Sequence, residues 1–167
     1  MKGLGCTGHI DLSRIQNFSK TDVQAKVCAF LSTQKKAAEC KKENLVLYCG
    51  FAHGADLLFA EAAIACCVDV VAVLPCEREE FAAEHPDGGA AFWRALEKAK
   101  DVVIVPCKEY RYLGVAEYIV KKCDVMLGLC DTEKWREVEQ TGKEVARGGT
   151  FDVLRMAKKA GKEIVLF

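Results

Sequence analysis

Five short runs of continuously apolar residues constrain the fold of this chain more than any other feature. They cover Leu45 to Cys49, Val70 to Leu74, Val102 to Val105, Val125 to Cys130 and Ile164 to Phe167, and a weaker sixth run covers Lys2 to Cys6. They are rich in β-branched residues and lack polar alternation, which is typical of strands buried on both faces of a parallel sheet. Helix-like segments separate the runs. The sequence therefore predicts an α/β fold: a single Rossmann-like three-layer domain over residues 1–167, with a mostly parallel sheet of about six strands.

The segments between the runs have helical spacing. The first, from about Thr21 to Glu43, places an apolar stripe on one side, and Ser19 or Thr21 would cap it. Further helices are predicted from Ala55 to Cys67, Gly89 to Lys100, Gly114 to Cys123 and Thr150 to Ala160, with Gly161 ending the last one. The polar stretch from Asp131 to Arg147 is expected to hold a short helix in a mobile flap.

Composition and charge exclude several classes of protein. Hydrophobic residues make up 51% of the chain and charged residues 29%, which argues against long disorder. The 24 basic residues equal the 24 acidic ones, so there is no basic excess for sequence-independent binding of nucleic acid. No signal peptide and no run of roughly 18 apolar residues is visible. We expect a cytoplasmic protein that does not bind membranes and whose favoured partner is not nucleic acid.

Ten cysteines are present, and most of them lie inside apolar strand or helix patterns. There is no CxxC pair, and the adjacent Cys66 and Cys67, expected on a helix, would point about 100° apart, which is poor zinc geometry. We expect reduced thiols that pack as small hydrophobic groups, and no metal.

The first strand carries a literal GxGxxG pattern from Gly3 to Gly8. Its context argues against a dinucleotide cofactor, because the glycines lie within or directly after a strand and the next helix begins only near residue 21. We expect no cofactor. Thr7, Gly8 and His9 remain candidates to line a ligand pocket at the end of this strand, although His9 could equally be an ordinary loop histidine.

A second glycine-rich loop joins a buried strand to a helix. Glycines at both ends allow a tight turn, and free amides at a helix start favour an anion. We assign ligand binding to Gly50, Phe51, Ala52, Gly54 and Asp56. The alternative is a plain strand-to-helix turn, and for Asp56 satisfying backbone donors is the favoured role, because a carboxylate repels phosphate.

A third loop opens the last predicted helix. Its two glycines, a hydroxyl and the helix dipole make a second anion site, and Arg147 adds a positive charge. The candidate ligand-binding residues are Arg147, Gly148, Gly149 and Thr150, with Thr150 as a simple N-cap as the alternative. Asp131, just past a strand, either binds a ribose hydroxyl or begins the polar stretch.

Taken together, these motifs resemble the SLOG superfamily, the Rossmann-like group that contains the Lonely Guy phosphoribohydrolases and the DNA-processing Smf domain, and look closest to its bacterial nucleotide-sensing members. The matching motifs are Thr7-Gly8-His9 with Asp11-Leu12-Ser13, Gly54-Ala55-Asp56 with Ala60-Glu61, Leu74-Pro75, and Gly148-Gly149-Thr150 with Gly161. The resemblance implies a nucleotide pocket, which adds Pro75 to the ligand-binding set, and a homodimer formed through helices near that pocket.

The resemblance also shows where enzymes and binders differ. Lonely Guy enzymes carry a PGGxGTxxE signature with a catalytic Glu. Here Arg147 stands in place of the Pro, the glycine spacing is shorter and Asp152 is the nearest carboxylate. The leading hypothesis is binding, for sensing or processing, of a nucleotide-derived phosphorylated ligand. The rival is an N-glycosidic hydrolase of nucleoside monophosphates with Asp152 or Glu61 as catalyst, and a third possibility is single-stranded DNA binding.

Overall fold

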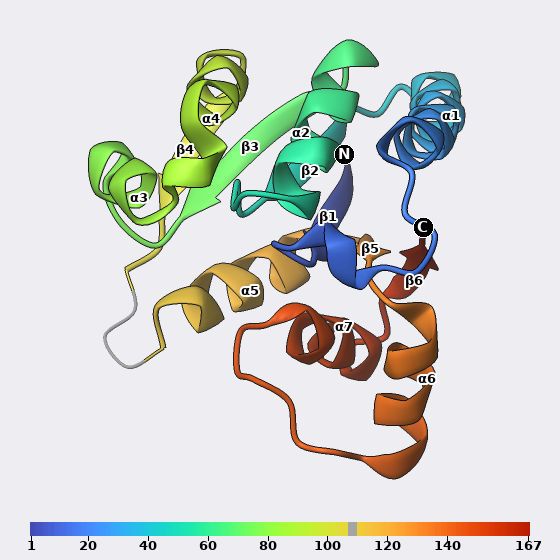
Figure 1. Ribbon diagram of the computed structural model, residues 1–167. Helices are drawn as coiled ribbons and strands as arrows, with labels where there is room; N and C mark the ends of the chain where they lie inside the picture. Colours follow the sequence, from blue (N-terminus) through green and yellow to red (C-terminus); the bar gives the residue numbers. More distant parts are fainter. Residues whose placement is uncertain (107–109) are drawn as a thin grey trace.

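Six parallel strands form the sheet at the centre of this molecule, and helices cover both of its faces (Figure 1). The computed structural model describes residues 1–106 and 110–167. Its strands are β1 (Lys2–Gly8), β2 (Leu45–Cys49), β3 (Asp69–Leu74), β4 (Asp101–Ile104), β5 (Val125–Leu129) and β6 (Glu163–Leu166), arranged in the order β4-β3-β2-β1-β5-β6. All five strand pairs are parallel, which confirms the predicted fold class.

The apolar runs are explained by their place in the sheet. Leu4 on β1 pairs with Leu47 on β2 and with Val125 on β5, so the middle of β1 has a neighbour on each side. Every residue of β2 and β5 is buried, whereas the edge strands β4 and β6 are only partly covered. A strand covered by helices on both faces has no solvent-facing position for a polar residue. Apolar and polar residues therefore do not alternate along these strands.

The described helices divide between the two faces of the sheet. They are α1 (Lys20–Cys40), α2 (Ala55–Ala65), α3 (Arg78–Glu84), α4 (Gly89–Glu97), α5 (Arg111–Lys122), α6 (Thr132–Thr141) and α7 (Thr150–Lys159), with short 3-10 turns η1 (Leu12–Arg14) and η2 (Pro86–Gly88). Residues of α1 to α4 share one apolar core with the sheet, and residues of α5 to α7 share a second on the opposite face. Within the described residues, none of these helices combines the length and apolar character needed to cross a membrane.

Local chemistry explains where the helices begin and end. Ser19 caps α1 as predicted, since its Oγ accepts the Asp22 N–H at 3.3 Å. Gly161, at φ 70°, follows the end of α7, which confirms its predicted role. The prediction that Cys66 and Cys67 lie on a helix is wrong: α2 ends at Ala65, and Cys67 adopts a left-handed φ of 53° that no helix accommodates.

The GxGxxG pattern serves helix packing. A Cβ at Gly3 would lie 2.3 Å from the Lys122 carbonyl oxygen, and one at Gly5 would lie 2.7 Å from Ile119 Cγ2. These two glycines therefore let the end of α5 pack directly on β1, which gives the first two glycines of the pattern a structural role.

Candidate functional site

The order of the sheet places a topological switch point at β1. The chain runs outward from β1 to β4 on one side and then returns to β1's other side as β5 and β6. Ligands of open parallel sheets bind beyond the carboxyl ends of the strands at such a point. A cavity of about 640 Å³ opens there, lined by residues of the β1 end and its following loop, the loop after β2, α5, and the start of α7.

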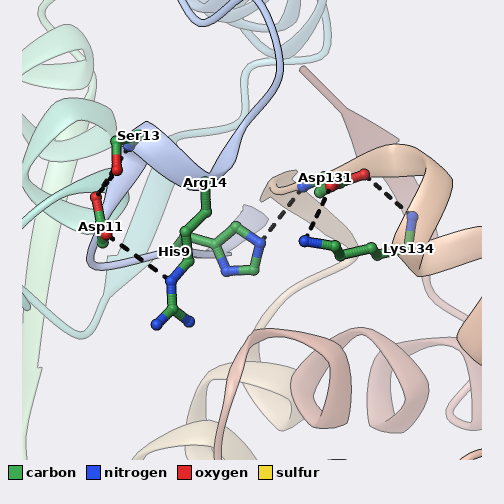
Figure 2. A network of polar contacts seen from close by, with 6 residues as sticks. All are labelled: His9, Asp11, Ser13, Arg14, Asp131 and Lys134. Carbon is green, nitrogen blue, oxygen red and sulfur yellow. Dashed lines mark hydrogen bonds and ion pairs between the residues drawn. The ribbon is translucent and has the colours of Figure 1, made fainter.

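The end of β1 supplies the first wall of this cavity. Thr7, Gly8 and His9 all line it, and the backbone of His9 is tied to β5 because its N–H donates to the Leu129 carbonyl at 3.1 Å. The Asp131 N–H donates to His9 Nε2 at 3.4 Å (Figure 2), so the neutral ring carries its proton on Nδ1. Burial, with a smaller contribution from nearby Arg14, holds the pKa of His9 below its ordinary value.

A cationic side chain follows His9 in the same loop. Arg14 lies beside His9 in Figure 2, and its Nε is 3.8 Å from Asp11 Oδ2. Asp11 also accepts two hydrogen bonds from Ser13, at 3.0 Å from the N–H and 2.6 Å from the hydroxyl. Both Asp11 and Arg14 line the cavity. Arg14 was missed by the sequence reasoning, although it directly follows the Asp11-Leu12-Ser13 motif.

Asp131 caps a helix. Its Oδ1 accepts the N–H groups of Glu133 and Lys134, both at 3.1 Å, which makes it the N-cap of α6. These bonds, together with the Lys134 ammonium 3.5 Å away, lower the pKa of the Asp131 carboxyl (Figure 2). Asp131 therefore has the second of its two predicted roles, as the residue that begins the polar stretch. It is not among the residues that line the cavity.

The loop after β2 supplies the second wall. Gly50, Ala52 and Asp56 line the cavity. Gly54 lies behind it: its φ is 89°, and an added Cβ would lie 2.2 Å from the Ile10 carbonyl oxygen, so only glycine allows the loops after β1 and β2 to pack together. Phe51 does not line the cavity: its backbone has a left-handed φ of 59°, and its ring is 1% exposed and packs in the core.

Asp56 stands at the floor of the cavity with little hydrogen bonding. Its Oδ2 accepts the Ala52 N–H at 3.4 Å, the backbone-donor role favoured for it from the sequence. Burial raises the pKa of the Asp56 carboxyl to about 7. Two thiols lie close by: Cys6, Cys49 and Asp56 hold one potential metal-ligand atom each, all within 4.8 Å of one another. No short motif in the sequence indicates this group of three side chains, because their proximity depends on the register of two strands.

The start of α7 supplies the third wall. Gly149 is its N-cap, with no side-chain cap bond within the described residues, and the first bond of the helix runs from the Val153 N–H to the Gly149 carbonyl at 3.0 Å. Thr150 is thus the first helical residue, and the predicted alternative of Thr150 as N-cap is wrong. The amides of Thr150, Phe151 and Asp152 precede that first bond. They form the positive end of the helix dipole.

Arg147 and Asp152 flank this helix start. The Arg147 guanidinium lies 4.9 Å from the centre of the Tyr110 ring, and Arg147, Gly148, Gly149 and Thr150 all line the cavity. Gly148, at φ 70°, donates its N–H to Asp152 Oδ2 at 2.8 Å. The Asp152 carboxylate therefore braces the glycine turn.

The remaining predicted residues lie apart from this cavity. Glu61 lines a separate cavity of about 400 Å³, together with Gly54, Leu57 and Asp87. Pro75 is buried behind the end of β3 and lines neither cavity. The two carboxylates named as candidate catalysts, Asp152 and Glu61, are thus not brought together.

Comparison with known proteins finds likeness at the level of structure. No protein-family model matches the chain, and no curated protein matches it. The solved structure of DNA processing protein A (DprA) from Streptococcus pneumoniae matches with a TM-score of 0.60 at 14% identity over 99% of this chain, which spans 50% of that protein's length. A structural-genomics protein, TM1055, matches with a TM-score of 0.53 at 14% identity, covering 98% of this chain and 72% of that one. Likeness at this identity shows a shared fold.

Proposed function

Because the chain has the Rossmann-like fold of the SLOG superfamily, we propose that it binds a nucleotide or nucleotide-derived phosphorylated ligand in the cavity at the switch point. The phosphate binds at Gly148 to Thr150, and the loop from Gly50 to Gly54 forms the opposite wall. The observation that carries the proposal is the uncapped start of α7, which opens into the larger cavity.

The phosphate end of the site combines hydrogen-bond donors from three places in the chain. The free amides at the start of α7 supply hydrogen bonds along the helix dipole. Arg147 supplies a bidentate guanidinium from the same loop, and Arg14 a second one from the loop after β1. Both arginines are largely exposed before a ligand binds, so an anion gains their charge without first breaking a buried ion pair.

The rest of the cavity suits a nucleoside. Its volume of about 640 Å³ lies within the range typical of small-molecule sites, roughly 300 to 1,000 Å³. Apolar side chains from α5 and α7 line one side, and the rings of His9, His85 and Tyr112 reach the cavity as well. Flat rings beside apolar walls favour stacking of a base, while the charged groups gather at the phosphate end.

Thermal unfolding of the purified chain with a ligand panel tests this proposal. The panel contains nucleoside mono-, di- and triphosphates, cyclic dinucleotides and ADP-ribose, with unphosphorylated nucleosides for comparison. A ligand at a hundred times its Kd stabilises a protein by about 2.7 kcal/mol, which raises the Tm of a chain of this size by about 5 to 10 °C. We expect that rise for a phosphorylated member and not for its nucleoside.

Two arginine variants test whether the rise in Tm comes from ligand binding in the cavity. Arg147→Ala removes a guanidinium from the cavity and should abolish most of the rise. Arg136→Ala removes an exposed guanidinium on α6 that does not line the cavity, and should leave the rise intact. Equal stabilisation by nucleosides and nucleotides, or an unchanged rise in Arg147→Ala, contradicts the phosphate assignment.

We propose binding and not N-glycosidic hydrolysis, because neither Asp152 nor Glu61 lines the cavity with the phosphate donors. Incubation with the stabilising nucleotide, followed by chromatography for free base, checks this distinction, and base release above the spontaneous rate contradicts it. Single-stranded DNA is a weaker candidate, because the balance of 24 basic and 24 acidic residues offers little to follow a phosphate backbone. A mobility shift at low salt would support DNA instead.

A further inference from the structure

Beneath the proposed nucleotide site lies a group of three side chains with a different chemistry. Gly5 on β1 pairs with Tyr48 on β2, so Cys6 and Cys49 follow at the next position of these neighbouring strands. Both thiols pack in the core on the α2 face of the sheet, and Asp56 comes from the first turn of α2. Three rigid elements thus bring two sulfurs and a carboxylate to within 4.8 Å of one another.

The donor set matches zinc. Thiolate and carboxylate ligands bind Zn²⁺ at about 2.3 Å and about 2.0 to 2.2 Å, which places tetrahedral donor atoms about 3.6 to 3.8 Å apart. Side chains within 4.8 Å reach that spacing by shifts of less than about 1 Å. Two soft sulfurs argue against Mg²⁺ and Ca²⁺, which prefer all-oxygen sites.

Backbone amides support two of the three ligands. The Phe51 N–H donates to Cys49 Sγ at 3.4 Å, and the Ala52 N–H donates to Asp56 Oδ2 at 3.4 Å. Hydrogen bonds of this kind orient metal ligands and stabilise their charged forms. The left-handed backbone of Phe51, a strained conformation for a bulky residue, belongs to the turn that holds both amides.

The group also has an entry path and an open side. Cys6 and Asp56 both line the large cavity, whereas Cys49 is fully buried behind them. A metal held by three protein ligands would keep its fourth position toward the cavity, the arrangement of zinc sites that bind water or a ligand. We propose that Cys6, Cys49 and Asp56 form a three-ligand Zn²⁺ site whose fourth position opens into the cavity.

Titration of the reduced, metal-free chain of residues 1–167 with Co²⁺, a coloured probe for zinc sites, tests this proposal. We expect one Co²⁺ per chain, thiolate-to-cobalt charge-transfer absorption, the intense visible bands of tetrahedral cobalt, and displacement by Zn²⁺. Cys49→Ser should weaken Zn²⁺ binding at least roughly tenfold and reduce the charge-transfer band. Asp56→Asn should weaken binding by a similar factor while keeping both thiolate bands.

Control variants separate this site from the other cysteines. Cys123→Ser removes a buried thiol on the opposite face, and Cys66→Ser removes a thiol that contacts the Cys28 carbonyl at 3.7 Å. Both should bind Co²⁺ as the unmodified chain does. Absence of the bands, an undiminished charge-transfer band with unchanged affinity in Cys49→Ser, or loss of the bands in Cys66→Ser overturns the proposal. If circular dichroism shows that Cys49→Ser does not fold, Asp56→Asn decides, because unchanged affinity in it also overturns the site. No nucleotide enters these titrations, so their outcome is separate from that of the phosphate assignment.

Discussion

The substitution Asp56→Asn in metal-free protein tests quantitatively how strongly burial at the cavity floor disfavours a charged carboxylate. The unfolded carboxyl titrates near 3.8, and burial raises the folded pKa to about 7. A raised acid pKa means that the folded state resists ionisation. The contribution of Asp56 to the stability of the unmodified chain is therefore most favourable below pH 3.8, and it is lost as the pH rises from there through 7.

The expected magnitude follows from the size of the pKa change. One pKa unit corresponds to 1.36 kcal/mol, so the raised pKa of Asp56 costs about 4 kcal/mol of folding free energy at pH 8.5 and about 1.7 kcal/mol at pH 5, relative to a side chain whose pKa does not change on folding. These figures are upper bounds, because the carboxyl lines the cavity and water reaches it. Asn is neutral and similar in shape. Asp56→Asn should therefore be the more stable chain, by a margin that widens by up to about 2.5 kcal/mol between pH 5 and pH 8.5.

Urea unfolding at the two pH values measures this margin. Glu97→Gln, which removes an exposed carboxylate far from the cavity, controls for the loss of one negative charge and should show a margin of less than about 0.5 kcal/mol. An equal margin for Asp56→Asn at pH 5 and pH 8.5 would refute the reasoning that burial holds this carboxyl in its neutral form.

Three further predictions concern the loops around the cavity. The NMR titration midpoint of His9 should lie below 6.5, because burial and Arg14 disfavour its charged form. The contribution of His9 to folding stability is then lost as the pH falls through 6.5, and a midpoint above 6.5 contradicts this assignment. Asp131→Ala should cost about 1 kcal/mol in urea unfolding through loss of the α6 cap, whereas Asp131→Asn should cost little, and equal losses would refute the capping role. Gly54→Ala should cost about 3 kcal/mol or more in the same assay, because φ is 89° and the Ile10 carbonyl leaves no room; a cost under about 1 kcal/mol would contradict that packing.

The strands were predictable because a strand buried on both faces requires a continuous run of apolar residues. The runs at β2 and β5 contain no exposed residue, and the structure places both in the interior of the sheet. Helix ends were less predictable, since they depend on single backbone conformations. The apolar pattern of α2 continues through Cys67, but the left-handed φ of that residue, 53°, ends the helix earlier.

The site was predictable where a loop motif carries the chemistry. The glycine turns after β2 and before α7 both reach the cavity, and both were predicted from glycines placed next to a helix start. Side-chain direction was not predictable in the same way. Phe51 belongs to the motif but turns into the core, and Asp152 is used in bracing Gly148. The grouping of Cys6 with Cys49 depends on the register of two strands that lie more than forty residues apart in the chain, which no local pattern records.

Amide chemical-shift mapping tests the central claim most directly. The ¹⁵N-labelled chain is titrated with the nucleotide that gives the largest thermal shift, and separately with its unphosphorylated nucleoside. We expect the nucleotide to shift the amide signals of Gly149, Thr150 and Phe151 at the start of α7, and the nucleoside to leave them unchanged. Shifts confined to residues outside the cavity, or equal shifts at α7 with both ligands, would contradict a phosphate site at this helix.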